Sequence, residues 1–202
     1  MSGSSGASLA AQEPPGSAEH ARELLERSGA MLTGHFLLSS GRHSDVYVQK
    51  ARILERPADT MAVARTIVSW YGDVDVVVAP AVGAIALGFA VALAADARSV
   101  FAERTDGVMA LRRGFDLRPG ERALIVEDVV TTGASAREVW DLVGAHGADR
   151  LGVAALIDRS ATDPGFPMRA VVRVDAGTWH EDRCPLCAAG SPIDSPGSRH
   201  LR

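Results

Sequence analysis

The chain has 202 residues, of which 47% are apolar and 23% charged, and its formal net charge is −4. A chain of this length buries roughly 70% of its unfolded surface and needs no disulfide or metal to hold a core. The longest apolar run, residues 84–95, is too short to span a bilayer. No secretory signal opens the chain, and its acidic balance argues against a broad nucleic-acid-binding or membrane-binding surface. We therefore expect a cytoplasmic protein with no nucleic-acid or membrane partner.

The first part of the chain is irregular in pattern. Residues 1–17 are mostly Ser, Gly, Ala and Pro, and we predict that they form a disordered or non-native tail outside the fold. Apolar spacing predicts a helix from residue 18 to about 28. Residues 34–49 indicate only short extended pieces around a turn, and Pro57 opens a second helix that runs to about residue 70.

From residue 74 onward, short apolar runs alternate with helical stretches. Strands are predicted at 74–79, 99–102, 123–127, 151–157 and 170–174, and helices at 85–95 and 136–146. Apolar strands without alternation are typical of a parallel sheet that is covered on both faces. We predict a doubly wound α/β fold with a mainly parallel sheet, in a single domain over residues 18–202. Its core would be 61–175, with a small hood made by 18–60 and about 176–202.

Residues 124–135 (LIVEDVVTTGAS) carry the clearest chemical signal. An apolar strand ends in Glu127 and Asp128, then a hydroxyl-rich loop leads through Gly133 into a helix. Free backbone N–H groups at a helix start bind phosphate, and glycine allows close approach of the backbone. The adjacent carboxylates suit ribose hydroxyls or a hydrated Mg²⁺. The alternative is a capped helix after a strand that happens to end in acids.

Residues 124–135 resemble the signature with which type I phosphoribosyltransferases bind 5-phosphoribosyl 1-diphosphate (PRPP). Residues 34–47 (GHFLLSSGRHSDVY) resemble the amino-terminal motif of orotate phosphoribosyltransferases. Residues 79–84 resemble the diphosphate loop of that family, 101–115 its mobile catalytic loop, and 156–159 the strand end that contacts orotate.

The resemblance implies a role for each matching residue. Glu127 and Asp128 would bind ribose hydroxyls, and Asp128 would help to hold Mg²⁺, directly or through water. Arg159 would pair bidentately with the orotate carboxylate, unless it forms a surface ion pair. Further implied substrate contacts come from Ser39, Tyr47, Val82, Gly83, Ala84, Thr131, Thr132, Gly133, Ala134 and Ser135. Arg104 and Arg112 would act as catalytic cations in a lid over 103–114, for which the alternative is a solvated hairpin.

These residues predict a Mg²⁺-dependent enzyme that makes orotidine 5′-monophosphate and diphosphate from orotate and PRPP, in pyrimidine synthesis. The resemblance also implies a homodimer whose lids reach the neighbouring site. One alternative is a phosphoribosyltransferase for a purine base, and another is a PRPP-sensing regulator without catalysis.

The distribution of basic residues departs from the family. Only one of the 21 basic residues, Lys50, is a lysine. The lid, the diphosphate loop and the amino-terminal motif, where the family usually has lysines, hold arginine, Val82-Gly83 and Ser39 instead. Lys50 lies outside all three places, so we expect the diphosphate chemistry to depend on arginine, which unlike lysine stays charged.

The two cysteines form a C-x-x-C pair, Cys184 and Cys187. This spacing is half of a structural zinc site, which His180 and His200 would complete. The alternatives are a plain turn with two reduced thiols and a redox role. His35 and His43 are interpreted as polar members of the hood.

Overall fold

The computed structural model describes residues 18–38, 40–174 and 177–196. Its helices are α1 (Ala18–Arg27), α2 (Ala51–Leu54), α3 (Pro57–Val68), α4 (Ile85–Ala95), α5 (Ala134–Ala145), the 3₁₀ helix η1 (Glu181–Arg183) and α6 (Pro185–Ala188). Its strands are β1 (Met31–Leu37), β2 (His43–Val48), β3 (Val76–Pro80), β4 (Arg98–Thr105), β5 (Val108–Leu111), β6 (Arg122–Val130), β7 (Asp149–Asp158), β8 (Met168–Arg173) and β9 (Thr178–Trp179). The predicted tail 1–17, Ser39 and His200 lie outside the described residues.

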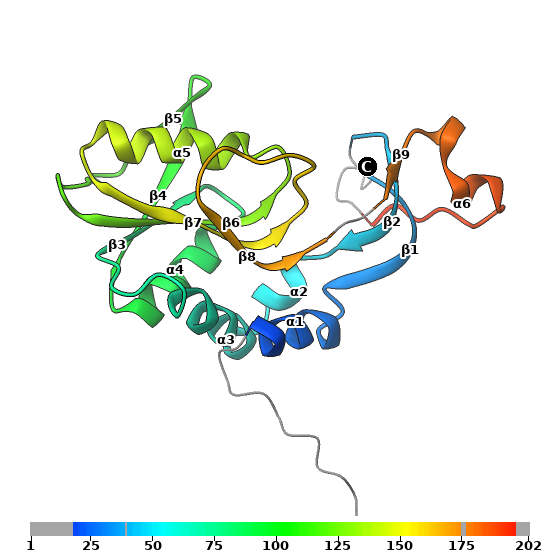
Figure 1. Ribbon diagram of the computed structural model, residues 1–202, viewed down its shortest axis with the longest axis horizontal. Coiled ribbons are helices and arrows are strands. Elements are labelled where there is room, and N and C mark those ends of the chain that lie inside the picture. The colour runs from blue at the N-terminus through cyan, green and yellow to red at the C-terminus, as the bar shows by residue number, and fades with distance from the viewer. Residues whose placement is uncertain (1–17, 39, 175–176, 197–202) are drawn as a thin grey trace, which may run out of the picture.

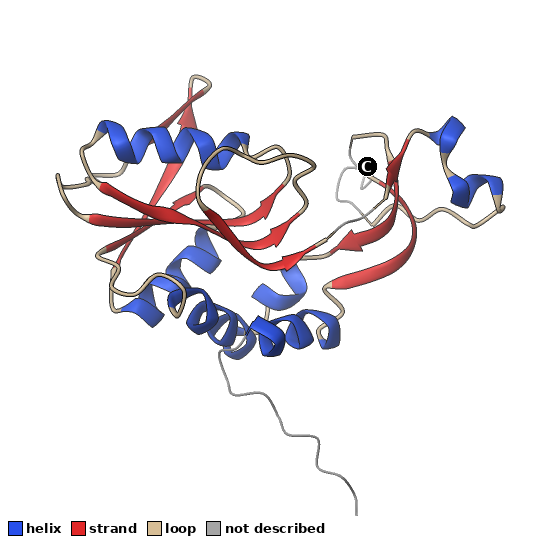
Figure 2. Cartoon of the chain, viewed as in Figure 1, coloured by secondary structure: helices blue, strands red, loops and turns tan. Residues whose placement is uncertain are grey.

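A six-stranded sheet with the order β5-β4-β3-β6-β7-β8 forms the centre of the fold. All neighbouring pairs are parallel except β4 and β5, which form an antiparallel hairpin at one edge. Helices α1, α3 and α4 lie against one face and α5 against the other (Figures 1 and 2). The predicted doubly wound α/β fold is thereby confirmed.

Alternate residues of the central strands pack into two separate apolar layers. On β3, Val77 belongs to the cluster with α1, α3 and α4, whereas Val76 and Val78 belong to the cluster beneath α5. All three valines are fully buried. This two-sided burial explains why the central strands read as unbroken apolar runs.

A second sheet, which we call the hood sheet, contains β1, β2 and β9 in the order β1-β2-β9. Its strands are antiparallel, and β2 meets β9 through His43 opposite Trp179. Residues 34–49, predicted to be largely irregular, are thus mostly a regular hairpin. Pairing with a segment more than 130 residues later in the chain completes the sheet, and local apolar spacing contains no signal for it.

Two further strand boundaries differ from the prediction. Strand β6 continues through both acids to Val130, so Glu127 and Asp128 lie within the strand rather than after it. The polar stretch after residue 102 forms the end of β4 and all of β5, joined at Asp106 and Gly107. Both of these residues have a positive φ, 52° and 84°, as the tight turns of β-hairpins require.

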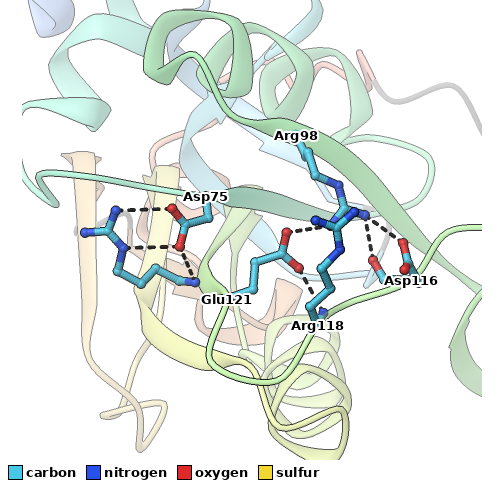
Figure 3. Close-up of polar contacts among 6 residues, drawn as sticks. Asp75, Arg98, Asp116, Arg118 and Glu121 are labelled. Carbon is cyan, nitrogen blue, oxygen red and sulfur yellow. Dashed lines mark hydrogen bonds and ion pairs between the residues drawn. The ribbon is translucent and has the colours of Figure 1, made fainter.

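Ion pairs gather at the amino-terminal ends of the parallel strands (Figure 3). Asp75 accepts hydrogen bonds from the backbone and guanidinium of Arg122, while Arg98 pairs with both Glu121 and Asp116. These contacts join the starts of β3, β4 and β6. The carboxyl ends of the same strands, where ligands bind in doubly wound folds, hold a different set of residues. Within the described part of the chain, no helix is long and apolar enough to cross a membrane.

Candidate active site

The loop after β6 forms a small cradle at the start of α5. Residues from Thr131 to Ala136 line a cavity of about 70 Å³ together with Glu127, Val129 and Val130. Gly133 is the N-cap of α5 with φ of 76°, and a Cβ there would lie 3.0 Å from Pro164 Cβ. The first N–H groups of a helix lack intrahelical acceptors and carry the positive end of its dipole. The structure therefore brings Thr131, Thr132, Gly133, Ala134 and Ser135 together in one loop at a helix N-terminus, a geometry that suits an anion.

The acid pair lies beside this cradle and is buried. Glu127 and Asp128 are 8% and 4% exposed. Glu127 Oε1 accepts a hydrogen bond from the Asp128 backbone N–H at 3.0 Å, and Asp128 Oδ1 accepts one from the Val129 N–H at 2.7 Å. Burial, together with the neighbouring Asp128 charge, raises the pKa of Glu127 to about 8. Glu127 therefore holds its proton at neutral pH, while Asp128 has a cationic partner.

That partner is Lys50, whose ammonium contacts Asp128 Oδ2. Lys50 is the N-cap of α2, directly after the hood sheet. Lys50 lies outside the three lysine places of the family in sequence, but in space it is next to Asp128. The two residues are 78 positions apart, so only the fold, and no local motif, brings them together.

Gly83 of the predicted diphosphate loop meets the same pair. A Cβ at Gly83 would overlap the Asp128 carboxylate and lie 2.7 Å from Lys50 Nζ. The loop follows β3, contains a cis peptide bond between Ala81 and Val82, and leads into α4 at Ala84. Among the described residues, the backbone N–H groups of Val82, Gly83 and Ala84 have no acceptor. The loop, the acid pair and Lys50 thus form one junction.

A larger pocket of about 580 Å³ opens between the hood and the cradle. Tyr47 and Arg159 line it, and Thr131 and Thr132 belong to both this pocket and the cradle. The pocket lining is completed by Leu37, Leu38, Ser40, Arg42, Ala161 and Thr178.

Arg159 is half-buried in this pocket, and its guanidinium has no hydrogen bond or ion pair to the described residues. Burial lowers its pKa, while the nearby charge of Asp45 raises it. Asp45 Oδ1 is itself buried without a hydrogen-bond partner in the described part of the chain. The alternative of a surface ion pair is therefore not what the structure shows, and Asp45 joins the site as a residue that we had not singled out.

The two predicted lid arginines lie on the β4–β5 hairpin. Arg104 pairs with Glu138 of α5 at 2.8 Å, and Arg112 donates to Thr105 Oγ1 at 3.3 Å. Neither belongs to the lining of the cradle or of the hood pocket. The structure thus does not bring them to the junction of Lys50 and Gly83, and their catalytic role stays a prediction.

Comparisons with known proteins agree with this geometry. The sequence model of the phosphoribosyl transferase domain matches residues 49–165. The orotate phosphoribosyltransferase of Thermotoga petrophila is 46% identical over 185 residues, which is 90% of this chain and 99% of that protein. The chain belongs to the orotate phosphoribosyltransferase family. The enzyme of that name from Caldanaerobacter subterraneus is 44% identical over 91% of this chain and 98% of its own length.

Solved structures of phosphoribosyltransferases share the fold. The orotate phosphoribosyltransferase of Mycobacterium tuberculosis, in complex with inorganic phosphate, has a TM-score of 0.60 and 27% identity, over 79% of this chain and 96% of its own. The adenine phosphoribosyltransferase of Rhodothermus marinus has a TM-score of 0.61 and 20% identity, over 77% of this chain and 99% of its own. At that identity the second likeness concerns the fold alone. The choice of base therefore depends on the pocket.

Proposed function

We propose that this protein transfers the phosphoribosyl group of PRPP to orotate, releasing diphosphate and forming orotidine 5′-monophosphate in pyrimidine synthesis. The observation that carries the choice of orotate is Arg159. A half-buried guanidinium without a carboxylate partner suits a planar anion, because it can donate two parallel hydrogen bonds to one carboxylate. The pocket shares Thr131 and Thr132 with the cradle, so a base there adjoins a phosphoribosyl group held by the cradle.

Each part of the site serves one part of PRPP. The cradle takes the 5′-phosphate, and Glu127 and Asp128 take the ribose hydroxyls. The free N–H groups of the 82–84 loop and the Lys50 ammonium face the diphosphate. Negative charge develops on that leaving group as its bond to the ribose breaks, so fixed donors stabilise the transition state. Arginine is therefore not the only cation that this chain offers to the reaction.

The acid pair also fits a magnesium ion bound together with PRPP. Mg²⁺ prefers oxygen ligands and keeps several waters. In the ligand-free chain both oxygens of Asp128 accept protein donors, and Oδ2 becomes available when Lys50 turns to the diphosphate, so we expect Asp128 to hold the ion directly or through water. When bound, Mg²⁺ neutralises charge on the diphosphate.

The β4–β5 hairpin is the proposed lid, and we propose a homodimer in which this hairpin reaches the neighbouring site. The hairpin extends beyond the sheet in Figure 1, and in each chain it carries Arg104 and Arg112 outside that chain's own cradle. No disulfide joins the two cysteines, which suits the reducing cytoplasm that we propose as the location of the protein.

The test is the loss of orotate absorbance when protein, PRPP and Mg²⁺ are mixed. Arg159→Gln should raise KM for orotate about 30-fold or more, because truncating a buried charge pair costs about 2 kcal/mol or more, with little change in KM for PRPP. Arg169→Gln is the matched control, since Arg169 stacks on Trp70 at 5.2 Å, outside the site. Consumption of adenine or hypoxanthine but not orotate would show a purine enzyme. PRPP binding with no base consumed would show a PRPP-sensing regulator.

A further inference from the structure

Two histidines and two cysteines meet on the hood, outside the linings of the cradle and the hood pocket. His35 lies on β1, His43 on β2, Cys184 is the N-cap of α6, and Cys187 lies within that helix. One ligand atom from each residue lies within 4.8 Å of all the others. His35, His43 and Cys184 are at most 5% exposed. These two histidines are not the ones that the sequence predicted as partners of the cysteines. His180 is exposed and outside this group, and His200 lies beyond the described residues.

The spacing of these atoms matches a tetrahedral metal site. Zinc bonds of 2.0–2.1 Å to nitrogen and 2.3 Å to sulfur imply ligand separations of about 3.3 Å for N–N and about 3.5 Å for N–S. His35 Nε2 lies 2.9 Å from His43 Nδ1 and 3.5 Å from Cys184 Sγ. Cys187 Sγ lies 3.7 Å from His35 Nε2 and 3.2 Å from His43 Nδ1. These four separations differ from the tetrahedral values by less than about 0.5 Å, and the remaining two are within 4.8 Å.

The surroundings of His35 also fit a metal ligand. Its Nδ1 lies 2.9 Å from the carbonyl oxygen of Ser191, which can only accept a hydrogen bond. In the neutral ring, Nδ1 therefore carries the proton and Nε2 turns its lone pair toward the cysteines. A backbone carbonyl bound to the second ring nitrogen is the usual way in which a protein orients a histidine ligand.

We propose that His35, His43, Cys184 and Cys187 bind one structural Zn²⁺ ion. Two thiolates and two neutral imidazoles cancel the charge of the ion, which makes the buried site neutral. Sulfur and nitrogen ligands in a tetrahedral arrangement favour zinc over the harder cations. Four protein ligands leave no open position, so the site is structural rather than catalytic.

The ion would fasten the C-terminal segment to the hood hairpin. Leu37 and Arg42, which line the proposed orotate pocket, lie close in sequence to His35 and His43. The Asp194 backbone already bonds to His35 and Leu37 at 2.8 Å. Zinc would therefore hold the hairpin in the shape that the pocket requires, at a distance from the PRPP cradle.

The experiment measures the zinc bound to the full chain. The protein is purified without chelator and incubated with added zinc, and gel filtration then removes the unbound ion. We expect about one zinc per chain, and a Co²⁺-loaded sample should show thiolate-to-cobalt charge-transfer bands and intense tetrahedral d–d bands. Cys187→Ser, which changes the least buried ligand, should lower zinc affinity more than about 100-fold and weaken the charge-transfer band. His180→Ala is the matched control and should keep full zinc.

A second measurement does not depend on how well a variant folds. In the zinc-loaded wild type, both thiols should react slowly with a thiol reagent and become reactive when a chelator removes the ion. Failure of the wild type to retain zinc, equal retention by Cys187→Ser, or a Cys184–Cys187 disulfide in the reduced cytosolic preparation would overturn the proposal. None of these results concerns orotate turnover, so the zinc site and the proposed activity can fail separately.

Discussion

The buried carboxyl of Glu127 predicts an unusual dependence of stability on pH. Its pKa is about 8 in the folded chain, because burial and the Asp128 charge disfavour the anion, against an ordinary value of 4.5. Between these values the folded state keeps a proton that the unfolded chain has released. Stability then falls as pH rises, because the unfolded state binds fewer protons. The contribution of protonated Glu127 to the free energy of unfolding is fully present below about pH 4.5 and is lost as the pH rises through about 8.

The size of the effect follows from proton linkage. One proton held only by the folded state changes the free energy of unfolding by at most about 1.4 kcal/mol per pH unit. For a domain of this length that is about 3–5 °C in Tm per pH unit. Glu127→Gln keeps the shape of the side chain but has no proton to lose. Its Tm, relative to wild type, should therefore rise steadily from about pH 5 to about pH 8.

The assay is thermal unfolding of the ligand-free chain at equal protein concentration across this pH range. Asp75→Asn is the control, because hydrogen bonds from Arg122 lower the pKa of Asp75. Asp75 is ionised in both the folded and the unfolded chain above pH 4.5, so the Tm of Asp75→Asn should differ from that of wild type by the same amount at every pH. A flat difference between Glu127→Gln and wild type across the window would refute the raised pKa.

Three further substitutions and one control variant test the junction and the lid. Lys50→Met leaves the Asp128 carboxylate unpaired and should lower stability by about 1–3 kcal/mol and weaken PRPP binding by calorimetry; unchanged PRPP affinity would remove Lys50 from the site. Gly83→Ala places a Cβ against Asp128 and should lower kcat/KM about 100-fold, and full activity would mean that the loop can move away freely. Arg104→Ala should lower kcat about 100-fold with little change in PRPP affinity. Glu138→Gln removes only the partner of Arg104 and should stay within about fivefold of wild type, so equal losses in the two variants would make Arg104 structural.

The central strands β3, β6 and β7 were predictable because they are buried on both faces over most of their length. Val76, Val77 and Val78 point alternately into two apolar layers, so the run has no polar position. The helix predicted over 85–95 agrees with α4 at both ends. An apolar run can be recognised in the local sequence, and these runs were enough to predict the fold class.

The two hairpins were only partly predicted, for different reasons. For residues 103–114 a solvated hairpin was the alternative to a lid, and Asp106-Gly107, a strong tight-turn signal between short runs, favours the hairpin that β4 and β5 form. The β1–β2 hairpin has only Phe36 and His35 buried along β1, because residues 32–34 are exposed and Leu37 lines the hood pocket rather than a core. No apolar period marks such a strand.

The histidines of the proposed metal site show the limit of reading short motifs. The C-x-x-C spacing indicates a pair of sulfur ligands, because residues three apart share one face of a helical turn. It contains nothing about the other two ligands. His180 is nearer in sequence, yet pairing of β9 with β2 brings His43, more than 130 residues earlier, to the cysteines.

Lys50 shows the same limit at the active site, and its chemistry explains why its position matters more than the rarity of lysine. The gap between the Asp128 carboxylate and Gly83 is narrow, because even a single Cβ on Gly83 would overlap the carboxylate. A lysine ammonium is compact and sits on a flexible stem, whereas a guanidinium is a wide planar fork. The Lys50 side chain is 39% exposed, so its ammonium can leave Asp128 for an arriving diphosphate without crossing packed protein. In the proposed reaction, Arg159 would hold the flat orotate carboxylate with its planar fork, and the chain's only lysine lies where a compact cation has to fit beside the backbone.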